Sequence, residues 1–195
     1  MTKEIEFFWE IGSTNSYFAW HLIRPIATRH GAVLQLRTLN LGQIFRRHNY
    51  VLMEEPPAKI NNRIRDLQRW AVGYDLPFRM PDVFPIKTSR AMRTVLAMRR
   101  RGKEFEFVDR LFSAYWERND AAIADYAGLA PLIAGTGEPP DEVIAEAESP
   151  QIRQLQAVET DDALARGVFG APSFIIDGEL FWGKDRMQFI EDALS

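Results

Sequence analysis

The chain has 195 residues, of which 46% are hydrophobic and 26% are charged, and its formal net charge is −3. This length can bury a sizeable apolar core, and the small negative net charge gives no electrostatic footprint for nucleic acid. No apolar run approaches about 18 residues and no signal-type segment precedes the first expected strand, so we expect a cytoplasmic domain without membrane or nucleic-acid partners.

The first expected elements are a strand, a polar turn, a helix and a second strand. Residues 5–9 are apolar and of strand type, and the polar residues 12–16 follow them at once. Ser13 is a favourable helix N-cap, beside backbone N–H groups whose partial positive charge favours an anion or a thiolate. A plain structural cap is the alternative interpretation. Gly31 ends the predicted helix, and residues 32–39 alternate as a strand.

The middle of the chain is predicted to be helical. The helices expected there cover residues 57–71, 88–101, 105–116, 120–126, 129–134, 141–149 and 151–166. The elements before and after this stretch make one fold only when they are joined. We therefore expect a discontinuous domain of residues 1–41 and 161–195, with residues 42–160 as a helical insertion.

The end of the chain predicts a β-hairpin. Ala171-Pro172 precedes the apolar run 174–176, and Asp177-Gly178 separates this run from residues 180–182. Because both turn residues tolerate a positive φ, Asp-Gly between two apolar runs indicates an antiparallel pair. An edge hairpin with a trans proline is the plain interpretation of this segment.

A last helix is expected after the hairpin. Gly183 ends the second strand, and residues 184–187 are predicted to start a helix whose apolar positions recur at helical spacing. Asp185 would then lie in the first turn, near the positive end of the helix dipole.

The order of these elements, with a proline entering the third strand, resembles a thioredoxin-like fold. The motifs that carry the resemblance are Ser13-Thr14-Asn15-Ser16-Tyr17, Asp66-Leu67-Gln68-Arg69-Trp70 with Leu76-Pro77-Phe78, Val168-Phe169-Gly170-Ala171-Pro172 and Phe181-Trp182-Gly183-Lys184-Asp185-Arg186. They resemble the family that includes 2-hydroxychromene-2-carboxylate isomerase and kappa-class glutathione transferase, over nearly the whole chain. The resemblance implies an α/β, DsbA-like fold with a large all-helical insertion and a cis Ala171-Pro172 bond. Thr14 and Asn15 depart from the proline and aromatic residue usual in the family.

The absence of cysteine limits the reactions that the protein can catalyse. A thioredoxin-like oxidoreductase needs two cysteines for thiol–disulfide exchange, and this chain has none. The resemblance instead implies glutathione as cofactor, with Ser13 stabilising its thiolate, in an isomerase of small aromatic or unsaturated carbonyl compounds. It also implies a homodimer. A kappa-like transferase that consumes glutathione and a non-catalytic binder are the alternatives.

The same resemblance suggests the remaining site residues. Ala171 would pair through its backbone with the cysteinyl backbone of glutathione, beside Pro172. Lys184, Asp185 and Arg186 would face the γ-glutamyl end, with Asp185 binding the α-amino group because a carboxylate and an ammonium form a charge-assisted bond.

The resemblance also points to three residues of the middle segment. Arg46 follows the second strand, where the family meets the glycine carboxylate of glutathione, although a surface charge cluster is the alternative. Lys59 and Asn62 precede Asp66 by one or two helical turns, at positions where relatives carry ligand-facing residues. Roles on the helix surface are the alternative for both, and a surface ion pair is expected between Asp66 and Arg69.

Two other patterns predict no further site. The three histidines lack ligand spacing, so no metal is expected. The basic run at residues 99–101 is interpreted as a solvated helix C-terminus, in preference to a nucleic-acid patch.

Overall fold

The computed structural model describes residues 2–51 and 54–195 of the chain. It divides into two compact units: a sheet unit, residues 1–44 and 154–195, and a helical unit, residues 45–153. The domain boundaries at residues 42 and 160 stay a prediction. Within the described residues, no helix is long and apolar enough to cross a membrane.

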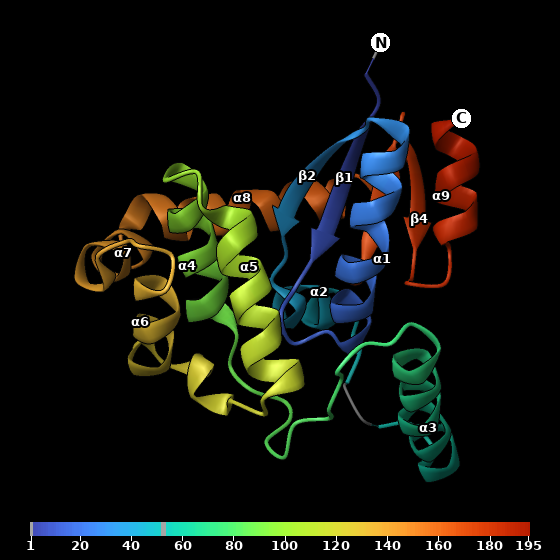
Figure 1. Cartoon of the computed structure of the whole chain (residues 1–195), viewed down its shortest axis with the longest axis horizontal. Coiled ribbons are helices and arrows are strands. Elements are labelled where there is room, and N and C mark those ends of the chain that lie inside the picture. The colour runs from blue at the N-terminus through green and yellow to red at the C-terminus, as the bar shows by residue number, and fades with distance from the viewer. Residues whose placement is uncertain (1, 52–53) are drawn as a thin grey trace. The chain divides into compact units, whose positions relative to one another are not determined.

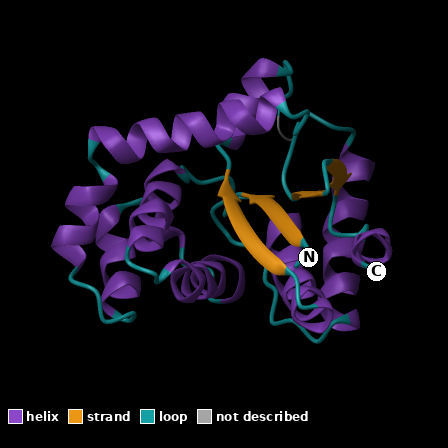
Figure 2. Ribbon diagram, turned by 90° about the horizontal axis from the view of Figure 1, so that it is seen from above, coloured by secondary structure: helices purple, strands orange, loops and turns teal. Residues whose placement is uncertain are grey.

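The sheet unit is built on four strands in the order β2-β1-β3-β4. Their bounds are β1 Glu4–Trp9, β2 Val33–Thr38, β3 Ser173–Ile176 and β4 Glu179–Trp182. The helices of this unit are α1 Thr14–His30, α9 Met187–Leu194, most of α8 Pro150–Ala165 and the start of α2 Leu41–Arg47. β1 runs parallel to β2 and antiparallel to β3, and β3 pairs antiparallel with β4. Helices cover both faces of this sheet (Figure 2).

One face of the sheet packs against α1 and α9, which lie side by side (Figure 1). Phe7 on β1 and Phe174 on β3 are register partners, and their rings stack at 5.0 Å. Trp20 of α1 stacks on Phe7 at 6.4 Å, and all three side chains are fully buried. Because aromatic side chains bury large apolar areas, this stack ties helix to sheet.

The opposite face packs against the end of α8. Phe8 and Ile175 form a buried cluster there with Ala163. The carboxylate of Glu159 on α8 accepts hydrogen bonds from the backbone N–H of Thr38 at 2.8 Å and from its hydroxyl at 2.7 Å. These bonds fix the helix to the end of β2.

The predicted hairpin is confirmed. Asp177 and Gly178 have φ values of 50° and 86°, so both turn residues are left-handed between the antiparallel strands β3 and β4. The predicted place of Asp185 is wrong, because α9 begins only at Met187 with Arg186 as its N-cap residue. Gly183, at φ 107°, turns the chain first, and a Cβ there would lie 2.5 Å from Asp185 Oδ1. The Asp185 carboxylate therefore folds back over the turn.

In the helical unit the described residues form helices and loops. The elements are α3 Pro57–Gly73, α4 Ser89–Arg100, α5 Glu104–Phe112, a π-helix Ser113–Glu117, a 3₁₀ helix Ala121–Ala124, α6 Tyr126–Ala134 and α7 Pro140–Ala147. The predicted helix 105–116 thus ends in a π-turn, and the predicted helix 120–126 is a short 3₁₀ turn. Arg99 and Arg100 do form the end of α4, where the arginines pair with carboxylates of the same unit.

Candidate functional site

Ser13 lies at the start of α1, as predicted. It is the N-cap residue with extended backbone angles, and its Oγ accepts a hydrogen bond from the N–H of Ser16 at 3.2 Å. The first turn of α1 contains no acidic residue, so no carboxylate there offsets the positive end of the helix dipole. The half-buried hydroxyl is therefore placed where a negative charge is favoured.

The Ser13 hydroxyl also contacts the distant proline segment. Its Oγ donates a hydrogen bond to the backbone carbonyl of Ala171 at 3.0 Å, across 158 positions of sequence. The Ala171-Pro172 bond is cis, as predicted. The structure thus brings together the two motifs on which the expected glutathione site depends.

Glu10 belongs to the same turn, at a position where the resemblance leads one to expect an aspartate at residue 10 or 11. Its side chain is 3% exposed, and its Oε2 accepts a hydrogen bond from the N–H of Gly12 at 2.7 Å. Its backbone carbonyl accepts from the N–H of Ser13 at 3.1 Å. Residue 10 therefore holds the turn into α1 at two points. The sequence pattern that could have indicated this role is an acidic residue shortly before Gly12 and the helix N-cap residue Ser13.

The predicted γ-glutamyl segment follows β4 and is tied to the proline strand. The carbonyl of Pro172 accepts a hydrogen bond from the N–H of Gly183 at 3.0 Å. Lys184 is 8% exposed, whereas Asp185 and Arg186 are more accessible and form an ion pair with each other. Asp185 and Arg186 can therefore meet a ligand directly, and Lys184 is largely enclosed by protein.

The other three predicted residues belong to the second half of α2 and to α3, in the helical unit. Arg46 and Asn62 are exposed, and Lys59 forms an ion pair with Glu55 at 2.8 Å. A hydrogen bond from Lys59, with a second from Arg63, holds the pKa of Glu55 below its usual value. Lys59 therefore already has a carboxylate partner.

Two further predictions concern charged groups. Asp66 and Arg69 form the expected i, i+3 ion pair, with 3.7 Å between their charged atoms. Within the described ranges 2–51 and 54–195, no group of three or more His, Asp or Glu side chains is arranged to hold a metal ion.

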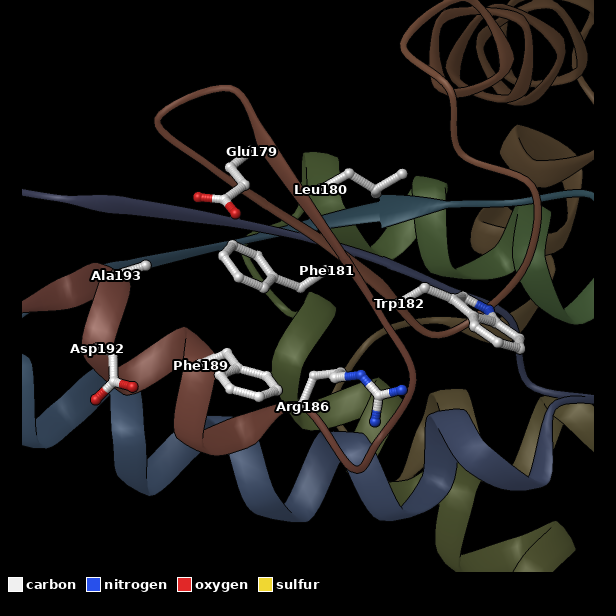
Figure 3. A pocket seen from close by; sticks show the side chains of 8 residues that line it. All are labelled: Glu179, Leu180, Phe181, Trp182, Arg186, Phe189, Asp192 and Ala193. Carbon is white, nitrogen blue, oxygen red and sulfur yellow. The ribbon is translucent and has the colours of Figure 1, made fainter.

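A cavity of about 460 Å³ lies along β4 and α9. Its lining residues are Glu179, Leu180, Phe181, Trp182, Arg186, Phe189, Asp192 and Ala193, and Figure 3 shows their arrangement. Ser13 is not among them, so this cavity is distinct from the serine site although both adjoin the segment after β4. Trp182 also packs on Phe169 at 5.1 Å between ring centres, and both rings are nearly half exposed.

Comparisons with known proteins agree with this geometry. The family model of the DSBA-like thioredoxin domain matches residues 4–195. A 2-hydroxychromene-2-carboxylate isomerase of Sphingobium xenophagum is 29% identical over 196 residues, covering 100% of this chain and 99% of the relative. Glutathione s-transferase kappa 2 of Caenorhabditis elegans is 24% identical over 211 residues, covering 99% and 92%. The solved structure of a 2-hydroxychromene-2-carboxylate isomerase superposes with a TM-score of 0.86 at 22% identity, covering 98% of this chain and 94% of that one. The expected DsbA-like thioredoxin fold is confirmed.

Proposed function

Because the chain belongs to the DSBA-like thioredoxin domain family, we propose that it is a glutathione-dependent isomerase of the 2-hydroxychromene-2-carboxylate type. The substrate would be a small aromatic compound with an unsaturated carbonyl group. The full-length match to relatives named as this isomerase supports the reaction type. We place the activity in the cytoplasm, whose reducing conditions suit both a chain without cysteine and a cofactor that must carry a free thiol.

One observation carries the proposal: the hydroxyl of Ser13 caps α1 and contacts the carbonyl of Ala171. The residues fit glutathione, since an oxygen donor at a helix N-terminus suits a thiolate and an adjoining backbone segment suits a peptide. With no cysteine in the chain, the sulfur must come from the bound cofactor. When bound, glutathione supplies a nucleophilic thiolate that can add reversibly to a conjugated carbonyl compound.

The single proton of the Ser13 hydroxyl has two competing acceptors in this proposal. In the structure it is donated to the Ala171 carbonyl. To stabilise a thiolate, the hydroxyl must turn and donate to the sulfur, while Oγ still accepts from the N–H of Ser16. The Ala171 carbonyl is then free for the cysteinyl N–H of the cofactor. Ser13 would thus exchange an internal hydrogen bond for a charge-assisted one.

The remaining residues have binding roles in the proposal. The Ala171 backbone beside Pro172 would hold the cysteinyl residue, and Asp185 and Arg186 would bind the γ-glutamyl end. Lys184, being enclosed, would act mainly by adding positive charge near that end. Roles for Arg46, Lys59 and Asn62 in binding glutathione stay a prediction from the resemblance, and Lys59 would have to leave Glu55 to bind a ligand.

A kappa-like glutathione transferase is the second candidate function. The kappa relative matches 99% of the chain, and the same serine site would serve a conjugation reaction. In that case the thiol is consumed, whereas an isomerase returns it. Thr14 and Asn15 at the start of α1 depart from the usual family residues, so a binder without catalysis is the third outcome that an assay must separate.

The test combines product analysis with two substitutions at one position. Purified protein is incubated with 2-hydroxychromene-2-carboxylate and glutathione, and both compounds are quantified. We expect a ring-opened isomer to form with no loss of free thiol. Ser13→Gly should lower turnover by about ten- to hundredfold, because a hydrogen bond to a charged group contributes about 1.5–3 kcal/mol.

Glycine is the informative replacement because it removes the hydroxyl but costs only a few tenths of a kcal/mol as a helix cap. Ser13→Ala, the matched variant, should lose similar activity and in addition about 1 kcal/mol of stability. Full activity of Ser13→Gly would show that the hydroxyl is only a cap. Consumption of glutathione in proportion to product would instead identify a transferase.

A further inference from the structure

Ser16 is the second serine of the motif Ser13-Thr14-Asn15-Ser16-Tyr17, and the proposed function uses only the first. The side chain of Ser16 is 0% exposed, and its hydroxyl has no hydrogen-bond partner among the residues that the structure describes. A buried hydroxyl without a partner costs folding free energy and is uncommon in native proteins. Such a group often takes part in the chemistry of a site.

Another buried helical hydroxyl of this chain bonds to its own helix. In α4, Thr94 is also 0% exposed, and its Oγ1 donates to the carbonyl of Arg90, four residues earlier, at 3.0 Å. The residue four positions before Ser16 is Gly12, which precedes the N-cap residue Ser13 and lies outside α1. The Ser16 hydroxyl therefore does not use the kind of acceptor that serves Thr94.

Ser16 lies directly beside the side-chain oxygen of Ser13, because its N–H donates to Ser13 Oγ at 3.2 Å. The Cα–Cβ bonds of a helix tilt toward its N-terminus, so the Ser16 side chain leans toward the same oxygen. A serine oxygen can accept two hydrogen bonds, and the Ser16 N–H takes one of these positions on Ser13. The unused donor of Ser16 is thus next to an oxygen that has a second acceptor position.

We propose that Ser16 is a positioning residue for the bound thiolate, an inference that rests on the proposed function. When Ser13 turns its proton from the Ala171 carbonyl to the sulfur, the Ser16 hydroxyl donates to Ser13 Oγ. This second bond polarises the Ser13 hydroxyl and makes its proton a stronger donor. The gain is larger toward a charged thiolate than toward a neutral carbonyl. Ser16 therefore lowers the pKa of the bound thiol without touching the ligand, in agreement with its complete burial.

The pKa of the thiol of glutathione bound to Ser16→Ala measures this effect. Alanine removes the hydroxyl, adds no volume and favours a helix. We expect the pKa of the bound thiol, followed by absorbance at about 240 nm, to rise by about half a pH unit relative to wild type. The variant without glutathione should melt at or above the wild-type temperature, because the lost hydroxyl had no partner. A merely structural role would lower the melting temperature and leave the pKa of the bound thiol unchanged.

Two comparisons separate this role from the general loss of a hydroxyl. Thr94→Val removes an equally buried hydroxyl in α4 and should leave the pKa of the bound thiol unchanged. In protein that already carries Ser13→Gly, Ser16→Ala should shift this pKa by less than about 0.2 pH units, since Ser16 acts through Ser13. Additive shifts in the double variant would overturn the proposed route through Ser13.

A disulfide tests the geometry without glutathione. Residues 13 and 16 have the spacing of a Cys-x-x-Cys pair, and the natural chain contains no cysteine. In Ser13→Cys with Ser16→Cys, diamide should accept two electrons and the two thiol protons as one intramolecular S–S bond forms, measured by mass. Ser13→Cys with Asn15→Cys is the matched control, whose thiols should stay free because residues two apart on a helix do not face each other. A pair at 13 and 16 that keeps both thiols would overturn the proposed adjacency.

The outcomes distinguish this inference from the proposed function. If the wild type leaves the bound thiol at its free pKa, the proposed function is wrong, and the role of Ser16 is wrong with it. If the wild type lowers that pKa and Ser16→Ala lowers it to the same extent, only the role of Ser16 is overturned.

Discussion

Both units of this chain join distant segments by ion pairs, and the sheet unit adds side-chain bonds to backbone groups 121 and 158 positions away. In the sheet unit, side chains bond to backbone groups far away in sequence: Ser13 to the carbonyl of Ala171, and Glu159 to the N–H of Thr38. In the helical unit, ion pairs between side chains dominate, such as Arg93 with Glu148. Backbone groups are present in every residue, whereas ion pairs depend on two particular side chains. The bond between Ser13 and Ala171 thus lies in the sheet unit, and its acceptor is a backbone carbonyl that any residue at position 171 would supply.

The largest expected effect concerns the aromatic core of the sheet unit. Phe174→Ala should lower the free energy of unfolding by about 3–5 kcal/mol, because it leaves a cavity beneath Phe7. Phe169→Ala, at a ring 45% exposed, is the matched control and should cost less than about 1 kcal/mol. Chemical denaturation of both variants measures the difference. Equal losses would show that the stack does not anchor the sheet.

A smaller loss is expected in the helical unit from Glu148→Ala. The side chain of Arg93 is 10% exposed, and its guanidinium lies 2.5 Å from the Glu148 carboxylate. Removing the carboxylate leaves a nearly buried charge without its acidic partner, which should cost about 2–3 kcal/mol after allowance for the partial exposure of Glu148. Arg93→Met with Glu148→Ala should recover part of that loss. If the double variant is no more stable than Glu148→Ala, the desolvation argument is wrong.

The smallest effect is a pH dependence in the sheet unit. A hydrogen bond from Arg166 holds the pKa of Glu6 below its ordinary value of 4.5, against the opposing effect of burial, and Arg37 adds to the shift. Because the pKa of Glu6 is lower in the folded than in the unfolded chain, ionised Glu6 stabilises the protein at pH values above its unfolded pKa. This contribution disappears as the pH falls through the pKa of Glu6 in the folded chain. Between about pH 5 and pH 3, Glu6→Gln should therefore lose less stability than the wild type.

The control for this pH effect is Glu4→Gln. Glu4 is exposed on the same strand and has no ion pair in the described part of the chain. Its substitution should leave the acid limb of the stability curve unchanged. An acid limb that is the same in Glu6→Gln and wild type would contradict the assignment to the Glu6 cluster.

Local patterns predicted most of the sheet unit. The cap at Ser13, the left-handed end at Gly31 and the turn at Asp177-Gly178 are each determined by conformational preferences of one or two residues. The start of α9 was placed too early, because the charged residues after Gly183 match a first helical turn while Gly183 itself bends the chain.

Local sequence patterns could not predict the long-range contacts. Nothing near Ser13 indicates that its hydroxyl reaches Ala171, and only the family resemblance joined the two. The clamp of Glu159 on β2 depends on tertiary geometry in the same way. The open edge of β4 follows from strand order, which alternation along one strand does not reveal.

The central claim is that Ser13 and the N-terminus of α1 stabilise a glutathione thiolate. Its most direct test is the absorbance of thiolate at about 240 nm, followed by pH titration of the glutathione complex of wild type and of Ser13→Gly. A free thiol has a pKa of about 8.5, and we expect the wild type to lower it by about one to two pH units and Ser13→Gly to reverse at least about half of that shift. Identical titrations of the two complexes, or a bound thiol with its free pKa, would contradict the claim.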